Sequence, residues 1–362
     1  MIIFKVLAYL FGIFGVVGTV MPFLPYDDWW IRGFDYPRQQ LVFILALAAV
    51  CWIFAYEQSG WVNWTVSLIL IAATLYQAYR ILPYTAVWQK DAADALVQNN
   101  DNHLSLMMAN VLQTNRNVGK VVEQTREMQP DILLTVETNN WWAEQLNDAF
   151  GNDYPHRVHI PLENLYGMNL YSRIPLIEPE VKYRVKDDIP SIDTRVKLAN
   201  DQEVNLYFVH PMPPSPTEAY ASTGRDAELA MVGRLVRERG GTTVVAGDLN
   251  DVAWSHSTRL FKRLSRLVDP RRGRGLFSTF HADYRIARWP LDHVFHSTDL
   301  AVVDLQKLGN NGSDHFPVYI NLSYEPHAKS DVPDEADTDD LQEAQETIDT
   351  ARAGKNDAIL KE

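Results

Sequence analysis

The 362-residue sequence predicts a mixed α/β domain that follows three membrane-spanning helices and precedes an acidic tail. Long apolar runs occupy most of residues 1–83, whereas short apolar runs separated by turns and amphipathic segments fill residues 101–326. The net charge of −13 divides into 0 over residues 1–83, −6 over residues 84–326 and −7 over residues 327–362. Only the middle zone is long enough, and polar enough at its surface, to enclose a large core.

Three apolar runs, at residues 6–24, 39–56 and 58–79, predict transmembrane helices. Each run is close to the roughly 20 residues that a helix needs to cross a bilayer, and tryptophan and tyrosine gather toward the run ends. A cleaved signal peptide is a weaker interpretation of the first run, since two more apolar runs follow it. Helices of a soluble core would carry a polar stripe, which these runs lack. We therefore expect a multi-pass protein whose partner is a lipid bilayer.

The charges that flank these runs leave open which side of the membrane carries the main domain. Three spans place the N-terminus and the domain on opposite sides. Lys5 lies on one side, and Arg32, Arg38, Arg80 and Lys90 lie on the other, which favours a cytoplasmic domain under the positive-inside rule. The three aspartates and two tryptophans of the first loop favour the external side instead.

Residues 101–326 carry the strands and helices of the predicted domain. The expected helices are residues 118–128 and 225–239, the second ended by Gly240 and Gly241. The expected strands are residues 104–109, 132–136, 170–171, 204–209, 242–246, 293–295 and 317–322. Many of these strands are too uniformly apolar to have one wet face, so we expect sheets that are covered on both faces.

The segments on either side of this domain are expected to lack a core of their own. Residues 84–100 are predicted to be a linker. Residues 327–362 are predicted to be a disordered tail, because their net charge is −7 and they have few large apolar side chains. Leu341, Ala344, Ile348 and Ala351 have helical spacing, so a transient or docked helix is the alternative. Cys51 is the only cysteine, which excludes an intrachain disulfide and a cysteine zinc cluster.

A basic segment lies between residues 259 and 274, where seven lysines and arginines accompany a single acid, Asp269. Three uses are compatible with it. The segment can contact nucleic-acid phosphates, attract anionic lipid headgroups, or form a solvated helix face and loop. The net charge of −6 over residues 84–326 disfavours broad binding to nucleic acid.

Polar side chains of a few chemical types lie at the ends of the predicted strands. They are Asn110, Glu137, His210, Asp248, Asn250, Asp292, Asp314 and His315. Strand ends that share a sheet edge gather in space, so these side chains are expected to converge on one crevice. At an effective dielectric constant near 20, two carboxylates about 5 Å apart repel each other by roughly 3 kcal/mol, so the cluster needs a cation. Oxygen ligands favour Mg²⁺, with Mn²⁺ as an alternative, and metal-assisted attack of water on a phosphoester is the chemistry that this set suggests.

Seven short motifs carry a resemblance to a known family. They are MANV at Asn110, DILLTVE at Glu137, LYSRIPL, VHP at His210, GDLN at Asp248, LDHVF at Asp292 and GSDHFPV at Asp314. Each motif alone is weak, but together and in this order they resemble the signature of the endonuclease/exonuclease/phosphatase superfamily. The resemblance implies a deoxyribonuclease-I-like fold, a four-layer α/β/β/α sandwich, over residues 101–326. The motifs HPMPP, TGRDAEL and RWPLDHVFHS resemble a membrane-associated bacterial subgroup, which implies a bacterial cell membrane as the location.

The resemblance also implies roles for the residues of the cluster. It implies that Asn110, Glu137 and Asp314 surround the metal. It further implies that Asp248 and Asn250 position the water or phosphate, that His315 is the general acid or the transition-state stabiliser, that Asp292 orients His315, and that His210 is a second phosphate contact. The family leaves open which group takes the proton of the water, and we assign Asp248 from its place in the GDLN motif.

The expected function is that of a membrane-anchored, Mg²⁺-dependent phosphoesterase. Its substrate stays open among a phospholipid headgroup, a small phosphoester and a nucleic acid, and between a monoester and a diester. The alternative is a catalytically inactive membrane protein that uses the same sandwich for binding or signalling. No protein partner can be inferred from the sequence.

Overall fold

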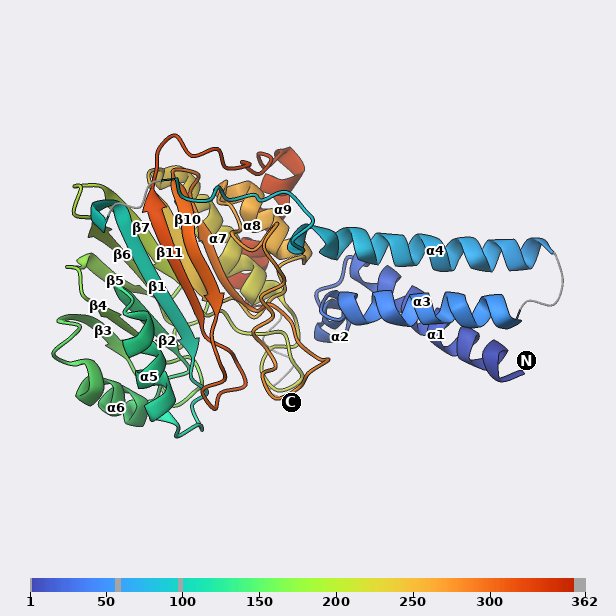
Figure 1. Cartoon of the computed structure of the whole chain (residues 1–362), viewed down its shortest axis with the longest axis horizontal. Helices are drawn as coiled ribbons and strands as arrows, with labels where there is room; N and C mark the ends of the chain where they lie inside the picture. Colours follow the sequence, from blue (N-terminus) through green and yellow to red (C-terminus); the bar gives the residue numbers. More distant parts are fainter. Residues whose placement is uncertain (1, 56–59, 97–99, 355–362) are drawn as a thin grey trace.

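The computed structural model describes residues 2–55, 60–96 and 100–354. Three long helices form a rod that projects from one side of a layered domain (Figure 1). Parts of the predicted second and third apolar runs, linker and tail, at residues 56–59, 97–99 and 355–362, lie outside the described residues.

The rod consists of three helices that are long and apolar enough to cross a membrane. They are α1 (Ile2–Val20), which continues into a 3₁₀ turn at Met21–Phe23, α3 (Arg38–Ala55), and α4 (Trp61–Ile81), which continues into a 3₁₀ turn at Leu82–Tyr84. The loop between α1 and α3 holds the short helix α2 (Trp29–Arg32) and a 3₁₀ turn at Gly33–Asp35, and it lies between the rod and the domain (Figure 1).

Small residues and a buried polar network hold the three helices together. Gly12, Gly15 and Gly18 are spaced along one side of α1, and a Cβ atom at Gly15 would lie 2.5 Å from a methyl group of Leu45 on α3. At the domain end of the rod, Arg38 donates to the Gln77 side chain at 3.1 Å, and Gln77 in turn donates to the Thr19 hydroxyl at 3.0 Å. Each of the three helices therefore contributes one member to this network.

Two mixed sheets form the centre of the domain. The six-stranded sheet has the order β10 (Leu300–Lys307), β11 (Val318–Tyr324), β1 (His103–Asn110), β2 (Ile132–Val136), β4 (Met168–Ser172) and β3 (His156–Ile160). The five-stranded sheet has the order β5 (Ile177–Lys182), β6 (Ser191–Lys197), β7 (Glu203–Phe208), β8 (Thr243–Asp248) and β9 (Asp292–His296). Their inner faces meet in one apolar core, to which both sheets contribute alternate side chains such as Leu134, Leu170, Leu206 and Val244.

Helices cover the outer face of each sheet. Helices α5 (Val118–Met128) and α6 (Asn140–Phe150) pack on the six-stranded sheet. Helices α7 (Thr223–Arg239) and α8 (His256–Ser265) pack on the five-stranded sheet. The predicted four-layer α/β/β/α sandwich is therefore confirmed.

The described part of the predicted linker, residues 84–96 and 100, packs against the domain. After α4 the chain crosses the domain surface, and a 3₁₀ turn at Asn100–Asn102 then leads into β1. Ala92 is fully buried in the core between the sheets. Asp91 is also buried and forms ion pairs with Lys262 at 3.0 Å and with Arg272 at 2.7 Å.

The tail differs from the predicted disorder, because residues 338–352 form a docked helix, α9 (Thr338–Arg352). Asp337 and Asp340 form a capping box at its N-terminus. Ala344 and Ile348 are buried against α7 and α8, so the helical spacing of the apolar residues was the informative signal. Arg263 of α8 binds the Asp340 carboxylate through two hydrogen bonds of 2.6 Å.

These contacts also account for the basic segment at residues 259–274. Besides Lys262, Arg263 and Arg272, the arginines at 266, 271 and 274 form ion pairs with Glu335, Asp269 and Asp94, respectively. Arg259 donates to the backbone carbonyls of Trp254 and Ser255. The segment thus fastens the linker and the tail to the domain and forms no open basic surface.

Candidate active site

Both sheets deliver polar side chains to the same end of the sandwich. Asn110 ends β1 and Glu137 follows β2, two neighbouring parallel strands of the six-stranded sheet. Asp248 ends β8 and Asp292 begins β9, and these two residues are paired in the register of the five-stranded sheet. His315 lies in the loop before β11. The positive φ of Glu137, +59°, is a left-handed conformation that is uncommon for a non-glycine residue and is found at functional sites.

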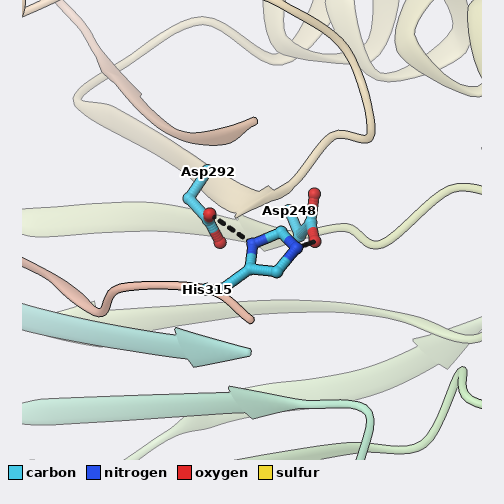
Figure 2. A group of neighbouring side chains, drawn as sticks. All are labelled: Asp248, Asp292 and His315. Carbon is cyan, nitrogen blue, oxygen red and sulfur yellow. Dashed lines mark hydrogen bonds and ion pairs between the residues drawn. The ribbon is translucent and has the colours of Figure 1, made fainter. Parts of the chain in front are cut away.

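His315 lies between two carboxylates, as Figure 2 shows. Its Nδ1 is 2.8 Å from Oδ2 of Asp292, and its Nε2 is 3.5 Å from Oδ2 of Asp248. All three side chains are buried. Both ring nitrogens therefore face an acceptor, which is the arrangement of an imidazolium held between anions.

The carboxylates determine the charge of His315. Burial alone would lower the pKa of His315, but the charges of Asp292, Asp248 and Asp314 and the hydrogen bond to Asp292 outweigh it and raise that pKa to about 10. His210, which is fully buried and 3.9 Å from Asp248, has a lowered pKa because desolvation dominates there. The site thus contains one imidazolium and one neutral imidazole at neutral pH.

Asn110 connects the two carboxylates that come from opposite sheets. Its Nδ2 donates to Glu137 at 2.7 Å and to Asp248 at 3.1 Å, and its Oδ1 accepts from the backbone N–H of Leu112 at 3.0 Å. Burial raises the pKa of Glu137 to about 7 and also raises the pKa of Asp248. These two carboxyl groups therefore lie close together, and the protein does not supply enough positive charge beside them to keep their pKa values at the usual level.

A cavity of about 650 Å³ opens over this cluster. Its lining includes five of the eight residues predicted from the sequence, namely Glu137, His210, Asn250, Asp314 and His315. The other three, Asn110, Asp248 and Asp292, are buried directly behind these residues, in hydrogen-bond or ion-pair contact with them. The structure therefore brings together all eight side chains.

The set of residues predicted from the strand ends does not include those that hold the GDLN loop. Arg225, at the start of α7, is buried and donates to the backbone carbonyl of Asn250 at 2.9 Å, while it also lies 3.4 Å from Asp251. The Tyr36 hydroxyl donates to the same carbonyl at 2.7 Å. Neither residue belongs to a strand end, so the pattern that identified the cluster contained no signal for them.

Among the residues on the cavity wall, the sequence did not indicate Tyr166 and Glu218, whereas Phe280 and Trp289 were expected either to line a pocket or to pack in the core. The Tyr166 ring lies 5.4 Å from the His210 ring, and its hydroxyl donates to Glu218. The Phe280 ring lies 4.9 Å from His315 on the other side. These rings restrict access to His210 and His315, and they come from loops whose sequences have no regular pattern.

The chemistry of the donor atoms fits a hard divalent cation. Glu137 and Asp314, two carboxylate residues, line the cavity, and burial raises the pKa of Glu137 in a place where a cation would stabilise the ionised form. Asp248, Asp292 and His315 also offer ligand atoms within 4.8 Å of one another. The hydrogen bond of His315 to Asp292 and its positive charge make that second group less suitable for a metal.

Comparisons with solved structures agree with the fold. The structure is similar to an endonuclease/exonuclease/phosphatase from Beutenbergia cavernae DSM 12333, with 17% identity and a TM-score of 0.50 over 62% of this chain and 72% of that chain. It is also similar to D. rerio TDP2 complexed with a single-strand DNA product, with 15% identity and a TM-score of 0.50 over 62% of this chain and 100% of that chain. No curated protein matches the sequence. These structural likenesses concern the fold alone.

A family model gives the assignment. The model of the Endonuclease/Exonuclease/phosphatase family matches residues 107–315, from β1 to the histidine at the floor of the cavity. The match spans more than half of the chain and includes every residue of the cluster described above. The chain therefore belongs to the endonuclease/exonuclease/phosphatase family.

Proposed function

We propose that this protein is a membrane-anchored hydrolase of phosphoester bonds that depends on Mg²⁺ or Mn²⁺. The observation that carries the proposal is the buried row Asp292–His315–Asp248, which faces a cavity that Glu137 and Asp314 also line. The family assignment supports a phosphoesterase type of hydrolase. The three apolar helices support anchoring in a membrane.

Glu137 and Asp314 would hold the metal ion, and the Asn110 amide would keep the Glu137 carboxylate in place through its 2.7 Å hydrogen bond. When bound, the ion supplies positive charge to a phosphate oxygen and to the acids around it. The remaining chemistry belongs to side chains of the protein.

Asp248 orients the attacking water and accepts its proton. Its Oδ1 accepts the backbone N–H of Asn250 at 3.0 Å, which fixes the carboxylate, and its raised pKa makes it a better base than an exposed aspartate. The Nδ2 of Asn250 donates to the backbone carbonyl of Pro211 at 3.0 Å. This hydrogen bond to the loop that also carries His210 fixes the orientation of the Asn250 side-chain amide, including its Oδ1. His210 and Asn250 then contact the phosphate from the same side of the cavity.

His315 acts as the general acid and stabilises the charge of the transition state. Asp292 binds its Nδ1–H, so Nε2–H is the proton available to the leaving oxygen. Because the neighbouring carboxylates keep the imidazolium protonated, the proton is in place before the bond to the leaving group breaks.

The test is hydrolysis by the purified full-length chain in detergent or nanodiscs. We would incubate it with Mg²⁺ and a panel of DNA, RNA, phospholipid, inositol phosphate and p-nitrophenyl phosphodiester substrates. We expect activity that EDTA abolishes and that Asp248→Ala or His315→Ala reduces at least about 10²-fold without loss of folding. Activity that survives both substitutions would refute the site. A folded chain that hydrolyses none of these substrates would instead favour an inactive binding protein.

A further inference from the structure

The loop between the first two apolar helices forms part of the wall of the catalytic cavity. Trp29, Gly33, Tyr36 and Pro37 line it together with Glu137 and His315 of the domain. Pro37 immediately precedes α3, one of the three helices long enough to span a membrane. The cavity is therefore built jointly by the catalytic domain and by the membrane-proximal end of the anchor.

Hydrogen bonds fix this loop to the domain. The backbone N–H of Trp29 donates to the carbonyl of Tyr220 at 2.8 Å, and the indole N–H of the fully buried Trp254 donates to the carbonyl of Asp35 at 2.7 Å. The Tyr36 ring packs edge-on against Trp289 with centroids 5.9 Å apart. The loop is thus a constituent of the site, and the cavity cannot move far from the ends of α1, α3 and α4.

A loop of the domain that contains Ile286 contacts the first turn of α3. The Gln40 side chain, in the first turn of α3, donates to the backbone carbonyl of Ile286 at 2.6 Å. Ile286 is 81% exposed and Tyr284 is 58% exposed. Tyr26 is 57% exposed and lies on the anchor loop, which is the loop of residues 24–37 between the first two apolar helices. Exposed apolar and tyrosine side chains beside the end of a transmembrane helix are typical of a protein surface that rests on headgroups.

The charges of the cavity are unsuited to a polyanion. Among the residues that the structure describes, the cavity lining includes no lysine or arginine, and most of it is aromatic, leucine or proline. Six of the seven basic side chains of the segment at residues 259–274 form ion pairs within the chain, and the seventh, Arg259, donates to backbone carbonyls. Nucleic-acid binding relies on several basic contacts to successive phosphates, which this cavity does not supply.

Resting on the function proposed above, we propose that the substrate is an amphiphile held in the adjacent membrane, whose phosphoester headgroup enters the cavity between the anchor loop and the catalytic residues while its apolar chains stay in the bilayer. The apolar wall formed by Trp29, Phe280 and Trp289 contacts the part of the substrate next to the phosphate. One water molecule forms a new P–O bond and gives its proton to Asp248, and the bond to the leaving oxygen breaks as His315 protonates it.

Two probe substrates with the same scissile bond test this inference. Hexadecyl p-nitrophenyl phosphate inserts in phosphatidylcholine vesicles, whereas ethyl p-nitrophenyl phosphate stays in water. The full-length chain is reconstituted in these vesicles with Mg²⁺, and release of p-nitrophenol is followed for both probes. We expect the hexadecyl ester to be hydrolysed at least about 100-fold faster at equal total concentration.

Variants separate recognition from simple enrichment of the probe in the vesicle. Trp29→Ala should lower the ratio of the hexadecyl rate to the ethyl rate about tenfold, because it removes an aromatic wall of the cavity. If Trp29→Ala fails to fold, Ile286→Ser, which lies outside the cavity lining, provides the test instead. It should lower the same ratio by about threefold. The matched controls are Trp61→Ala, at the far end of the anchor, and Val332→Ser, an exposed residue of the tail, and both should leave the ratio unchanged.

The outcomes are distinct. A rate ratio near one, or a ratio that neither Trp29→Ala nor Ile286→Ser lowers, overturns the inference but leaves the phosphoesterase function standing. Faster hydrolysis of a single-stranded DNA oligonucleotide than of the hexadecyl ester overturns it in favour of a nuclease. Absence of hydrolysis of every probe overturns the proposed function itself, and the inference with it.

Discussion

Asp292 and His315 lie 23 residues apart in the sequence, and a 2.8 Å hydrogen bond joins them at the floor of the cavity. Asp292 is the first residue of β9, so the sheet fixes its position, while the loop before β11 brings in His315. Thr279, whose hydroxyl accepts the backbone N–H groups of Leu291 and Asp292, closes the same corner. The orientation of the His315 imidazole therefore depends on Asp292, whose backbone is held both by β9 and by Thr279.

The first prediction concerns the charge of Asp292. Asp292→Asn keeps the volume of the side chain but removes the negative charge that helps to keep His315 protonated, so kcat should fall about 10²-fold to 10⁴-fold. Steady-state hydrolysis with Mg²⁺ measures this. Asp304→Asn, on β10 and away from the cavity, is the matched control and should have no effect. A change of less than about threefold in Asp292→Asn would show that His315 does not need this partner.

The second prediction concerns Gly247 in the GDLN motif. A Cβ atom at this position would lie 1.8 Å from the backbone carbonyl oxygen of Val209, and backbone cannot yield as a flexible side chain can. Gly247→Ala should therefore lower the free energy of unfolding by about 3 kcal/mol, at the upper end of the cost of overpacking. Thermal or denaturant unfolding measures the change.

Gly119 on α5 provides the contrast for Gly247. A Cβ atom there meets nothing within 4 Å, so Gly119→Ala should stabilise the protein by about 0.5–1 kcal/mol through helix propensity. Equal effects of the two alanines would contradict the close approach of β8 to the segment after β7.

The sequence predicts some elements of the fold more clearly than others. Strands β1, β2, β7, β8, β9 and β11 lie on the predicted apolar runs because they are buried on both faces. Their polar ends gave the candidate cluster, since a polar residue directly after such a run marks the sheet edge. Edge strand β5 was missed because most of its side chains are exposed.

Charged residues hid other elements. Strand β6 was missed although it is largely buried, because it contains Asp193, whose charge is compensated by Arg184 through two hydrogen bonds of 2.8 and 2.7 Å. The acidic composition of the tail predicted disorder for a similar reason. The cation that pairs with Asp340 of α9 is Arg263, which lies on α8. Such compensation comes from residues far along the chain and cannot be read from a local pattern.

The third prediction concerns the pH dependence of α9 docking. His256 on α8 lies 2.6 Å from Glu343 on α9, and this hydrogen bond raises the pKa of His256 above its usual 6.5. Stabilisation by the pair is therefore fully present below pH 6.5 and is lost as the pH rises through the higher folded-state pKa. Both side chains are 44% exposed, so the effect is small, at most about 0.5 kcal/mol.

Hydrogen exchange of the α9 amides measures this docking. After correction for the intrinsic pH dependence of exchange, protection should decrease about twofold from pH 6 to pH 9 in the natural chain and should not change in His256→Gln. His327→Gln, at an exposed histidine before α9, is the control and should behave like the natural chain. Equal pH dependence in His256→Gln would assign the effect to other groups.

Across the whole molecule, the packing of the three-helix rod and its first loop against the domain is the feature that the sequence indicated least. The apolar runs predicted three long helices, and the motifs predicted the sandwich, yet nothing in either pattern indicated that Tyr36 would bind the carbonyl of Asn250 across 214 positions. Arg80 of α4 likewise donates to the carbonyl of Trp254. These contacts join separately predictable parts, and they make the anchor loop a wall of the site.

The fourth prediction tests water attack at the cluster directly. The full-length chain is incubated with ethyl p-nitrophenyl phosphate and Mg²⁺ in water enriched in oxygen-18, and mass spectrometry locates the label. We expect one labelled oxygen in ethyl phosphate, none in p-nitrophenol, and a labelling rate at least about 10²-fold lower in Asp248→Asn. Unlabelled ethyl phosphate, label in p-nitrophenol, or equal labelling by Asp248→Asn would contradict hydrolysis by these residues.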